Sequence, residues 1–310
     1  PPGDVQMWNT DPYTAVEKGG KLYGRGVEDN QQGMVSSVFA ALSFLKTKVK
    51  PRKTVKLLFI SDEEVGSRYG IIYLLQEHNL FSPSDWVLVP DGGHKDGSLI
   101  EIAEKSVLWL EFTVKGKQSH GSRPDLGINA FTAGSALVLS LNELNDVHNQ
   151  QNVLFDPPVS TFSPTRKSAN VPNINTIPGE DMFCMDCRIL PEVSVDLILN
   201  EIRNRCNDIE KKYRVTVTIE IKQRVESKST SKEEPFVLYL RDVVKEMNKV
   251  DPELIGIGGG TVGAHLRNLD IPTIVWATLE ESAHQPNEYC VIENMIGDAK
   301  IKARLMSPDL

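Results

Sequence analysis

Cysteine, basic charge and long apolar runs are all scarce in this sequence of 310 residues. Four cysteines are too few to staple a chain of this length, which favours a reducing compartment. With 34 basic against 42 acidic residues, the net charge of −8 repels a phosphate backbone and argues against nucleic acid as a partner. No apolar run approaches the roughly 20 residues of a membrane span, and no signal peptide is recognisable. We therefore expect a soluble, cytoplasmic protein without a membrane partner.

Two of the cysteines, Cys184 and Cys187, form a C-x-x-C pattern within DMFCMDCRIL. Such a pair can be a redox or zinc site. The segment is typical of a strand, however, and strand residues three apart point to opposite faces and cannot share a metal without a bend. Because the sequence has no second pair, a structural strand is the favoured interpretation.

The first hundred residues show α/β alternation. Residues 31–46 place apolar side chains at helical spacing. Two short apolar runs, 54–60 and 86–90, are typical of strands in a sheet that is covered on both faces, and a helix is predicted between them over 69–80. The same style resumes after the charged segment 226–235, with a predicted helix, two strands and a final helix.

The middle of the chain has a different pattern, because apolar and polar residues alternate from Val107 onward. Strands over 107–115 and 214–221 therefore have one solvent-exposed face. Between them the sequence predicts a helix near 128–145, strands near 152–162 and 181–190, and a helix over 199–213. The order β-α-β-β-α-β describes a self-contained layer of helices on an antiparallel sheet.

We accordingly predict two domains. The fold class is α/β, with a catalytic domain of mixed sheet formed by residues 1–106 and 223–310. An inserted α+β domain of residues 107–222 interrupts it. No internal repeat or low-complexity segment is present.

Three consecutive carboxylates, Asp62, Glu63 and Glu64, follow the apolar run at 54–60. Like charges a few ångströms apart destabilise one another and raise one another's pKa values. The arrangement therefore needs a cation, a proton or full solvation.

Other candidate ligands fall at equivalent positions. Asp91 and His284 each follow an apolar run, and Asp29 precedes the helix predicted at 31–46. In open α/β sheets, ligands bind beyond the carboxyl ends of the strands, so these groups are expected at one edge with Glu64. Carboxylate oxygens and an imidazole suit zinc, manganese or cobalt. Singly, each residue has an ordinary explanation as a cap, a turn or a surface residue, and their joint placement carries the metal hypothesis.

Six ordered motifs spanning nearly the whole chain resemble the signature blocks of a zinc metallopeptidase family. That family includes acetylornithine deacetylase, succinyl-diaminopimelate desuccinylase, aminoacylase, carboxypeptidase G and bacterial dipeptidases. The motifs are KLYGRGVEDNQQG, FISDEEVGS, VPDGG, GKQSHGSRPDLGINA, NINTIPG with DCRILP, and SAHQPNEY. The resemblance implies a zinc-exopeptidase-like catalytic domain with two divalent ions and an inserted lid that forms a homodimer.

The resemblance also implies roles for residues of the catalytic domain. Asp29 corresponds to the carboxylate that bridges the two ions, Glu64 and His284 to the remaining ligands of one ion, and Asp91 to a ligand of the other. Glu63 corresponds to the general base. In relatives the bridging aspartate precedes a cis peptide bond without proline, which implies the same for the bond after Asp29.

Further roles fall on the lid and on a Gly-rich turn. His120 resembles the lid histidine that stabilises the oxyanion from the neighbouring subunit. Asn175 and Arg188 resemble lid residues that hold the polar end of the substrate. Gly260 and Thr261 lie in the turn GIGGGTVGAH, where backbone N–H groups would cradle a substrate carboxylate.

The same turn supports a rival hypothesis, because Gly258, Gly260 and Gly263 spell G-x-G-x-x-G between a predicted strand and helix. Glu280 follows about twenty residues on, as in a dinucleotide-binding fold. Only about thirty residues remain after Glu280, too few for the further strands of such a domain. An NAD-dependent oxidoreductase is therefore the weaker interpretation.

One departure from the family pattern affects the metal set. The family's first ligand is the histidine of an H-x-D motif just before the PPGD block, and this sequence begins at that block. His94 is a weak substitute, because it falls in a polar turn. Three ligands are thus expected for one ion and two for the other, and a third hypothesis is a non-enzymatic remnant that dimerises through its lid.

Taken together, the sequence favours a metal-dependent amidohydrolase. We expect deacylation of a small N-acyl amino acid, with zinc as the metal and cobalt or manganese as alternatives. Hydrolysis of dipeptides or removal of a carboxyl-terminal residue is the next hypothesis, because the family uses one metal set for all of these reactions.

Overall fold

The computed structural model describes residues 2–307 and divides them into two compact units. Unit 1 comprises the residues up to 102, residues 229–255 and those from 261 onward; unit 2 comprises residues 103–228 and 256–260. The boundaries of the long insertion lie a few residues outside the predicted 107–222. Part of the Gly-rich turn, 256–260, groups with the insertion, although the sequence had assigned it to the catalytic domain.

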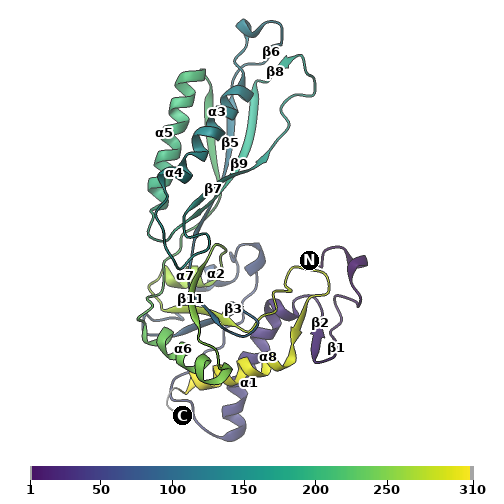
Figure 1. The fold of residues 1–310 in the computed structure, drawn as a ribbon, viewed down its shortest axis with the longest axis vertical. Helices are drawn as coiled ribbons and strands as arrows, with labels where there is room; N and C mark the ends of the chain where they lie inside the picture. The colour runs from purple at the N-terminus through teal and green to yellow at the C-terminus, as the bar shows by residue number, and fades with distance from the viewer. Residues whose placement is uncertain (1, 308–310) are drawn as a thin grey trace. The chain divides into compact units, whose positions relative to one another are not determined.

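A four-stranded mixed sheet lies at the centre of unit 1 (Figure 1). Its order is β11 (Glu253–Ile257), β4 (Leu99–Glu104), β12 (Thr273–Ala277) and β3 (Val87–Gly93). β12 pairs parallel with β3 and antiparallel with β4. Every residue of β12 is buried, as expected of a continuous apolar strand covered on both faces.

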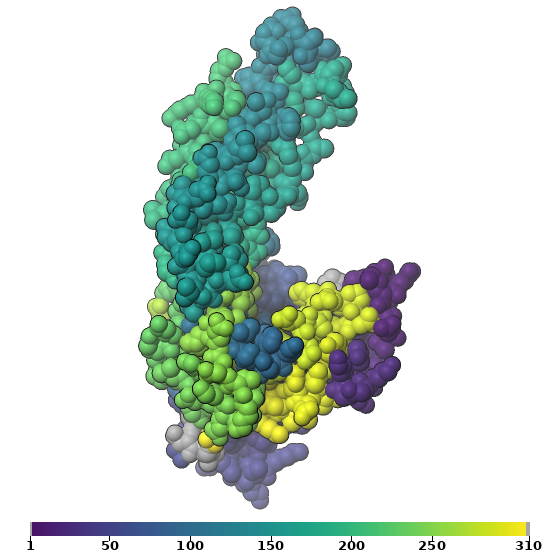
Figure 2. Space-filling view, viewed as in Figure 1, coloured from purple at the N-terminus to yellow at the C-terminus, as the bar shows by residue number. Residues whose placement is uncertain are grey.

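The helices of unit 1 are described by their bounds. They are α1 (Gly33–Thr47), α2 (Ile71–Glu77), α6 (Pro235–Asn248), α7 (Gly263–Arg267) and α8 (Ile292–Met306), with η1 (Val5–Met7), η3 (Glu63–Val65) and the π-helical turn η2 (Val27–Gln32). A small sheet joins β1 (Val16–Lys18), β2 (Lys21–Tyr23) and β13 (Tyr289–Val291). This sheet brings the yellow carboxyl-terminal residues against the purple amino-terminal ones (Figure 2). Within residues 2–307, no helix combines the length and apolar character needed to cross a membrane.

The buried face of α1 is not the one that its apolar residues mark. Gly33, Ser36, Ala40 and Phe44 are buried, whereas the large side chains at helical spacing are exposed: Val35, Phe39, Leu42 and Leu45. α1 packs along α8, and small residues allow two helix backbones to approach closely. The partner of the helix, more than its apolar pattern, selects the face that is buried.

The apolar run at 54–60 was predicted to be a strand, and this prediction is wrong. The segment has no assigned secondary structure, and Leu58 and Phe59 are exposed. Only Ile60 packs against the cluster that contains Val89. Among the described residues, β3 pairs with β12 alone, so the run lacks the backbone ladder that defines a strand.

Unit 2 has the predicted β-α-β-β-α-β order and an antiparallel sheet. Its strands are β10 (Thr216–Val225), β5 (Ser106–Lys115), β9 (Glu180–Ile189) and β7 (Thr161–Lys167), in that spatial order. The strand predicted at 152–162 begins only at Thr161, because 152–160 forms turns around a cis Asp156–Pro157 bond. At one end of the unit, β6 (Ser119–His120) pairs with β8 (Thr176–Ile177), next to η4 (Pro124–Leu126) (Figure 1).

Three helices accompany this sheet: α3 (Ala130–Asn142), α4 (Leu144–Val147) and α5 (Val195–Tyr213). The Ser194 side chain caps α5 by accepting a hydrogen bond from the Leu197 N–H. The buried stripe of α5 recurs every three or four residues, through Val195, Ile198, Ile202, Cys206 and Ile209. It packs into one large core with alternate residues of β5 and β9.

Both cysteines of the C-x-x-C pattern are free thiols on β9. Cys187 is buried in the core, and burial raises the pKa of its thiol to about 12. Cys184 lies on the opposite face of the strand, within 3.8 Å of Glu111. The structure thus agrees with a strand and not with a shared metal.

Candidate metal centre

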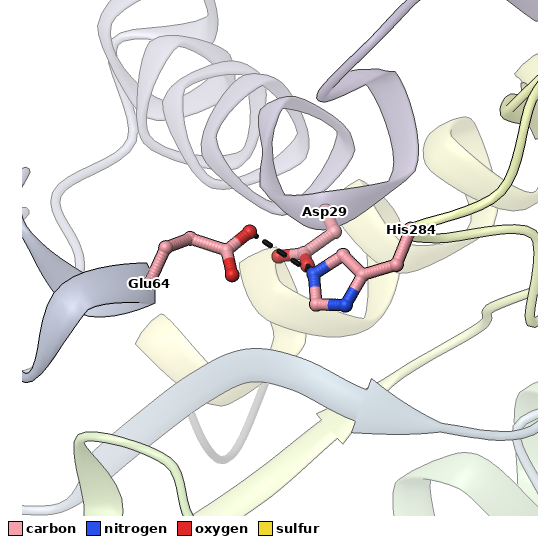
Figure 3. A group of neighbouring side chains, drawn as sticks. All are labelled: Asp29, Glu64 and His284. Carbon is pink, nitrogen blue, oxygen red and sulfur yellow. Dashed lines mark hydrogen bonds and ion pairs between the residues drawn. The ribbon is translucent and has the colours of Figure 1, made fainter. Parts of the chain in front are cut away.

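Three side chains from distant parts of unit 1 meet at one point. Asp29 comes from η2, Glu64 from η3 and His284 from the loop between β12 and β13 (Figure 3). His284 Nε2 lies 3.0 Å from Asp29 Oδ2 and 3.1 Å from Glu64 Oε1. One ligand atom from each residue lies within 4.8 Å of the other two, a spacing that suits a single metal ion.

Asp91 lies beside this group, near the end of β3. The Asn30 amide donates to Asp91 Oδ1 at 2.5 Å and to the Pro90 carbonyl at 2.7 Å. The pKa of Asp91 is raised to about 7, chiefly by burial and in addition by the charges of Asp29 and Glu63, while the hydrogen bond from Asn30 opposes the shift. Glu63 and Asp29 therefore both lie close enough to Asp91 to repel it.

Asn30 was not among the residues that the sequence singled out. It follows Asp29 across a peptide bond that is cis, as the family resemblance implied. Its position directly after a candidate bridging carboxylate was the available signal. An amide that contacts one carboxylate and adjoins another can orient both without adding negative charge.

The electrostatics of the group fit a cation. Burial raises the pKa of Asp29, the charge of Glu64 adds to this effect, and His284 opposes it. The hydrogen bond to Glu64 is the largest cause that raises the pKa of His284. Two carboxylates, Asp29 and Glu64, share the single imidazole of His284, and a divalent ion would relieve the repulsion between them. The donor set of oxygens and one nitrogen suits zinc, manganese or cobalt.

A cavity of about 230 Å³ opens beside the centre within unit 1. The candidate ligands Asp29 and Asp91 both line this cavity. The other lining residues are Glu28, Gly92, Gly93, Leu279, Glu281 and Ala283. A space of this size admits a small acyl or amino acid group.

Two other candidates in unit 1 have local partners. His94 Nδ1 lies 2.7 Å from Asp96 Oδ1, and hydrogen bonds from Ser98 and His94 lower the pKa of Asp96. Among the described residues, the group able to hold an ion contains Asp29, Glu64 and His284 and does not include His94. Asp62 accepts the Tyr69 N–H at 2.8 Å, which agrees with a structural role.

In unit 2 the pairing of β6 with β8 brings His120 and Asn175 together at an exposed tip. Asn175 Nδ2 lies 3.5 Å from His120 Nε2, and the Gly121 N–H donates to the Asn175 carbonyl at 2.6 Å. His120 Nδ1 is 2.8 Å from the Ser122 hydroxyl.

Arg188 has partners inside unit 2. Its guanidinium contacts Asp186 through two hydrogen bonds, of 2.7 and 3.1 Å, and donates to the Gly258 carbonyl at 2.9 Å. It therefore reaches the Gly-rich turn that includes Gly260. Thr261, the first residue after that turn, accepts the Gly263 N–H at 3.0 Å through its hydroxyl.

The Gly-rich turn does not open a dinucleotide-binding unit. The following helix, α7, has only five residues, and β4 separates β11 from β12 in the sheet. A dinucleotide fold needs adjacent parallel strands joined by a longer helix.

Comparisons with known proteins agree with a metal-dependent hydrolase. Over 97% of its length, the chain is 41% identical to an uncharacterized metallohydrolase of Methanococcus maripaludis and covers 76% of that protein. It is 25% identical to a succinyl-diaminopimelate desuccinylase of Pelagibacter ubique, with 99% of this chain and 79% of that protein covered. The fold is similar to that of an M20 family metallo-carboxypeptidase from Sulfolobus solfataricus, with a TM-score of 0.75, 17% identity, and coverage of 99% and 82%.

The profile of Peptidase family M20/M25/M40 matches residues 1–307, almost the whole chain. The α/β fold predicted from the sequence, with its second α+β part, is thereby confirmed. So is the prediction of a metal-dependent hydrolase over an oxidoreductase. On these grounds the chain belongs to Peptidase family M20/M25/M40 and is a metal-dependent hydrolase.

Proposed function

We propose that this protein hydrolyses the amide bond of a small N-acyl amino acid with the help of two divalent ions, preferably zinc. The single observation that carries this proposal is the meeting of Asp29, Glu64 and His284, whose ligand atoms lie within 4.8 Å of one another. Asp29 would bridge the ions, Glu64 and His284 would complete one site, and Asp91 would contribute to the other.

A bound pair of divalent ions acidifies a water molecule and polarises an amide carbonyl. The residues of the chain supply the proton transfers. Glu63 adjoins Glu64 and lies close enough to Asp91 to affect its pKa. In the proposed mechanism Glu63 takes one proton from the attacking water and delivers it to the nitrogen of the leaving amine as the C–N bond breaks.

Residues of unit 2 would bind the substrate and stabilise the oxyanion. His120 would donate a hydrogen bond from an imidazole nitrogen to the tetrahedral oxygen. Its exposure supports a role toward a group outside its own unit, and in a homodimer formed through unit 2 it would serve the neighbouring subunit. Asn175 and Arg188 would hold the polar end of the substrate, with backbone N–H groups at Gly260 and Thr261 around its carboxylate.

Deacylation is favoured by the relatives named as desuccinylases, and the cavity of about 230 Å³ is compatible with a small acyl group. Hydrolysis of a dipeptide or of a carboxyl-terminal residue is the second candidate, supported by the structural likeness to a metallo-carboxypeptidase.

The test is a substrate panel on the full-length protein loaded with zinc, cobalt or manganese. N-acetyl and N-succinyl amino acids are compared with dipeptides of matching side chains, and metal stoichiometry is measured on the same samples. Turnover of N-acyl substrates supports the proposal. Turnover of dipeptides alone replaces deacylase with dipeptidase, and absence of turnover on both substrate classes from a metal-loaded protein overturns the proposal.

A further inference from the structure

Two loops of unit 1 carry Asp29 and His284, and each loop places a buried glutamate against the backbone of the other. We define loop A as residues 24–30 and loop B as residues 279–289. Glu28 in loop A is 2% exposed and Glu288 in loop B is 0% exposed. A buried carboxylate is costly unless its oxygens accept hydrogen bonds, so the partners of these two side chains identify what they do.

Glu288 accepts hydrogen bonds from loop A. Its Oε1 accepts the backbone N–H groups of Glu28 at 2.9 Å and of Asp29 at 3.1 Å. Its Oε2 accepts the Gly26 N–H at 2.9 Å and the Arg25 guanidinium at 2.5 Å. A single side chain thus fixes the backbone of loop A up to and including the candidate bridging ligand.

Glu28 performs the same task in the opposite direction. Its Oε1 accepts the N–H of Glu280, and its Oε2 accepts both the N–H of Ser282 at 2.5 Å and the Ser282 hydroxyl at 2.6 Å. The Ser282 hydroxyl oxygen also accepts the Tyr289 N–H at 3.0 Å, which closes loop B on itself. Glu28 therefore fixes loop B two residues before His284.

Loop B needs such support because its backbone is unusual. Glu281, His284 and Asn287 have φ values of 60°, 60° and 63°, in the left-handed region that non-glycine residues rarely adopt. Each residue of this kind persists only where the surrounding structure holds it. Without external hydrogen bonds, loop B would relax and His284 would move relative to Asp29.

We propose that Glu28 and Glu288 are positioning residues of the metal centre and together form a reciprocal clasp that sets the separation of Asp29 and His284. Neither glutamate is one of the residues that meet at the centre itself. The clasp acts before an ion binds, since all its contacts join protein groups. This inference rests on the proposed metal-binding role of Asp29 and His284.

The chemistry of the clasp explains why both residues are glutamates. All four carboxylate oxygens face donors, so each residue must act as an acceptor on both sides. Glutamine has the same shape, but its NH₂ group would point at another donor. Glu28→Gln and Glu288→Gln therefore remove the acceptor pattern while leaving the volume of the side chain almost unchanged.

The first experiment measures zinc and cobalt affinity of the full-length protein by isothermal titration calorimetry. Substitution of groups that orient metal ligands typically costs about 10–100-fold in affinity, and we expect this range for each single variant. The double variant should lose little more metal affinity than the weaker-binding single variant. Either change alone already allows the separation of Asp29 and His284 to vary. Affinities within about twofold of the wild type would overturn the proposal, and so would fully additive losses.

Glu293→Gln is the matched control. Glu293 lies at the start of α8, five positions beyond Glu288, and is exposed. The Glu293→Gln substitution removes the same charge from the same part of the chain but breaks no contact of the clasp. The metal affinity of this variant should therefore equal that of the wild type. A loss as large as that of Glu288→Gln would assign the effect to net charge and overturn the clasp. If either clasp variant fails to fold, Ser282→Ala replaces it, because it removes only one donor to Glu28 and should weaken binding by a smaller factor.

A second readout needs no metal. Hydrogen exchange of the metal-free protein, followed by mass spectrometry of peptides, should accelerate at 26–29 in Glu288→Gln and at 280–282 in Glu28→Gln. If exchange changes in this way but the wild type binds no ion, the proposed function fails and the clasp remains. If the wild type binds metal while exchange and affinity stay unchanged in both variants, the clasp fails and the proposed function remains.

Discussion

The metal centre of unit 1 and the tip of unit 2 present functional candidates in two different ways. Behind Asp29 and His284 lie buried glutamates with seven donors from the opposite loops. The hydrogen bonds at His120 and Asn175 join residues of the tip itself, namely Ser122, Gly121, Arg123 and Asn173. The first arrangement depends on tertiary structure, whereas the second is a local device on an exposed pair of short strands.

Metal ligands and substrate-facing groups need different surroundings. Metal ligands must be held within a few tenths of an ångström of a fixed geometry, so they benefit from rigid buried support. A group that serves a substrate or a neighbouring subunit must be accessible, so it lies on an exposed segment. Substitutions behind the centre should therefore alter metal binding, and substitutions at the tip should alter turnover alone.

The largest effect is expected for Glu63→Gln in the full-length protein. With Glu63 as the proposed general base, its loss should lower amide hydrolysis by about 10²–10⁴-fold, while the proposed ligands Asp29, Glu64 and His284 should still hold an ion. Glu64→Gln should weaken metal binding first, because an amide is a poorer ligand than a carboxylate. Zinc stoichiometry and turnover are measured on both variants. Equal metal loss in both would contradict this division of roles, and unchanged turnover in Glu63→Gln would contradict the mechanism.

Lys302→Met tests whether the buried polar network of unit 1 is needed for stability. Lys302 is buried and donates to the Ser36 hydroxyl at 2.6 Å and the Gly33 carbonyl at 3.2 Å, with buried Asp298 one turn earlier on α8. Removing one member of a buried charged group costs about 3–5 kcal/mol, which we expect as a loss in unfolding free energy measured with urea. A loss of unfolding free energy below about 1 kcal/mol would contradict the view that this buried network is needed for stability.

The same variant makes a prediction about pH. Burial lowers the pKa of Lys302 from 10.5 to about 8, so between these pH values the unfolded chain binds more protons at this site than the folded protein. The contribution of Lys302 to stability therefore rises with pH across that window. The stability difference between wild type and Lys302→Met should widen from about pH 7.5 to about pH 9.5. A narrowing difference would refute the sign.

His120→Ala addresses the tip. Removal of one donor to a developing oxyanion typically costs about 10²–10³-fold in turnover. Metal affinity and unfolding free energy should not change, because the side chain is exposed and its contacts are local. His94→Ala is the control, as His94 also pairs locally in its own unit. Loss of metal from His120→Ala would erase the distinction between the two regions.

The smallest effects come from two helical glycines. A Cβ at Gly297 of α8 meets nothing within 4 Å, so Gly297→Ala should stabilise the protein by about 0.5–1 kcal/mol. A Cβ at Gly134 of α3 would lie 2.2 Å from the buried Asp181 carboxylate, which Lys167 holds at 2.6 Å. Gly134→Ala should therefore destabilise by about 1–3 kcal/mol. Thermal unfolding of both variants tests the contrast, and a shift of the same sign in both would contradict it.

Much of the fold follows from local patterns. The alternation in 107–115 and the stripe of α5 both predicted correct elements, because side-chain periods of two and about 3.6 residues are properties of the segment itself. The run at 54–60 misled for the same reason, since it has the composition of a strand and lacks a paired neighbour. Pairing is decided by another part of the chain, which no local pattern reports.

For the site, the sequence by itself determined the residue types and their order: carboxylates and a histidine after apolar segments, in motifs that identify the family. Only the tertiary structure decided that Asp29, Glu64 and His284 meet, that Arg188 donates to the Gly258 carbonyl, and which glutamates are buried. Glu28 and Glu288 differ in nothing local from exposed glutamates nearby. Their role depends on N–H groups more than two hundred positions away, and the hydrogen bonds that a folded backbone offers exist only once the two loops are side by side.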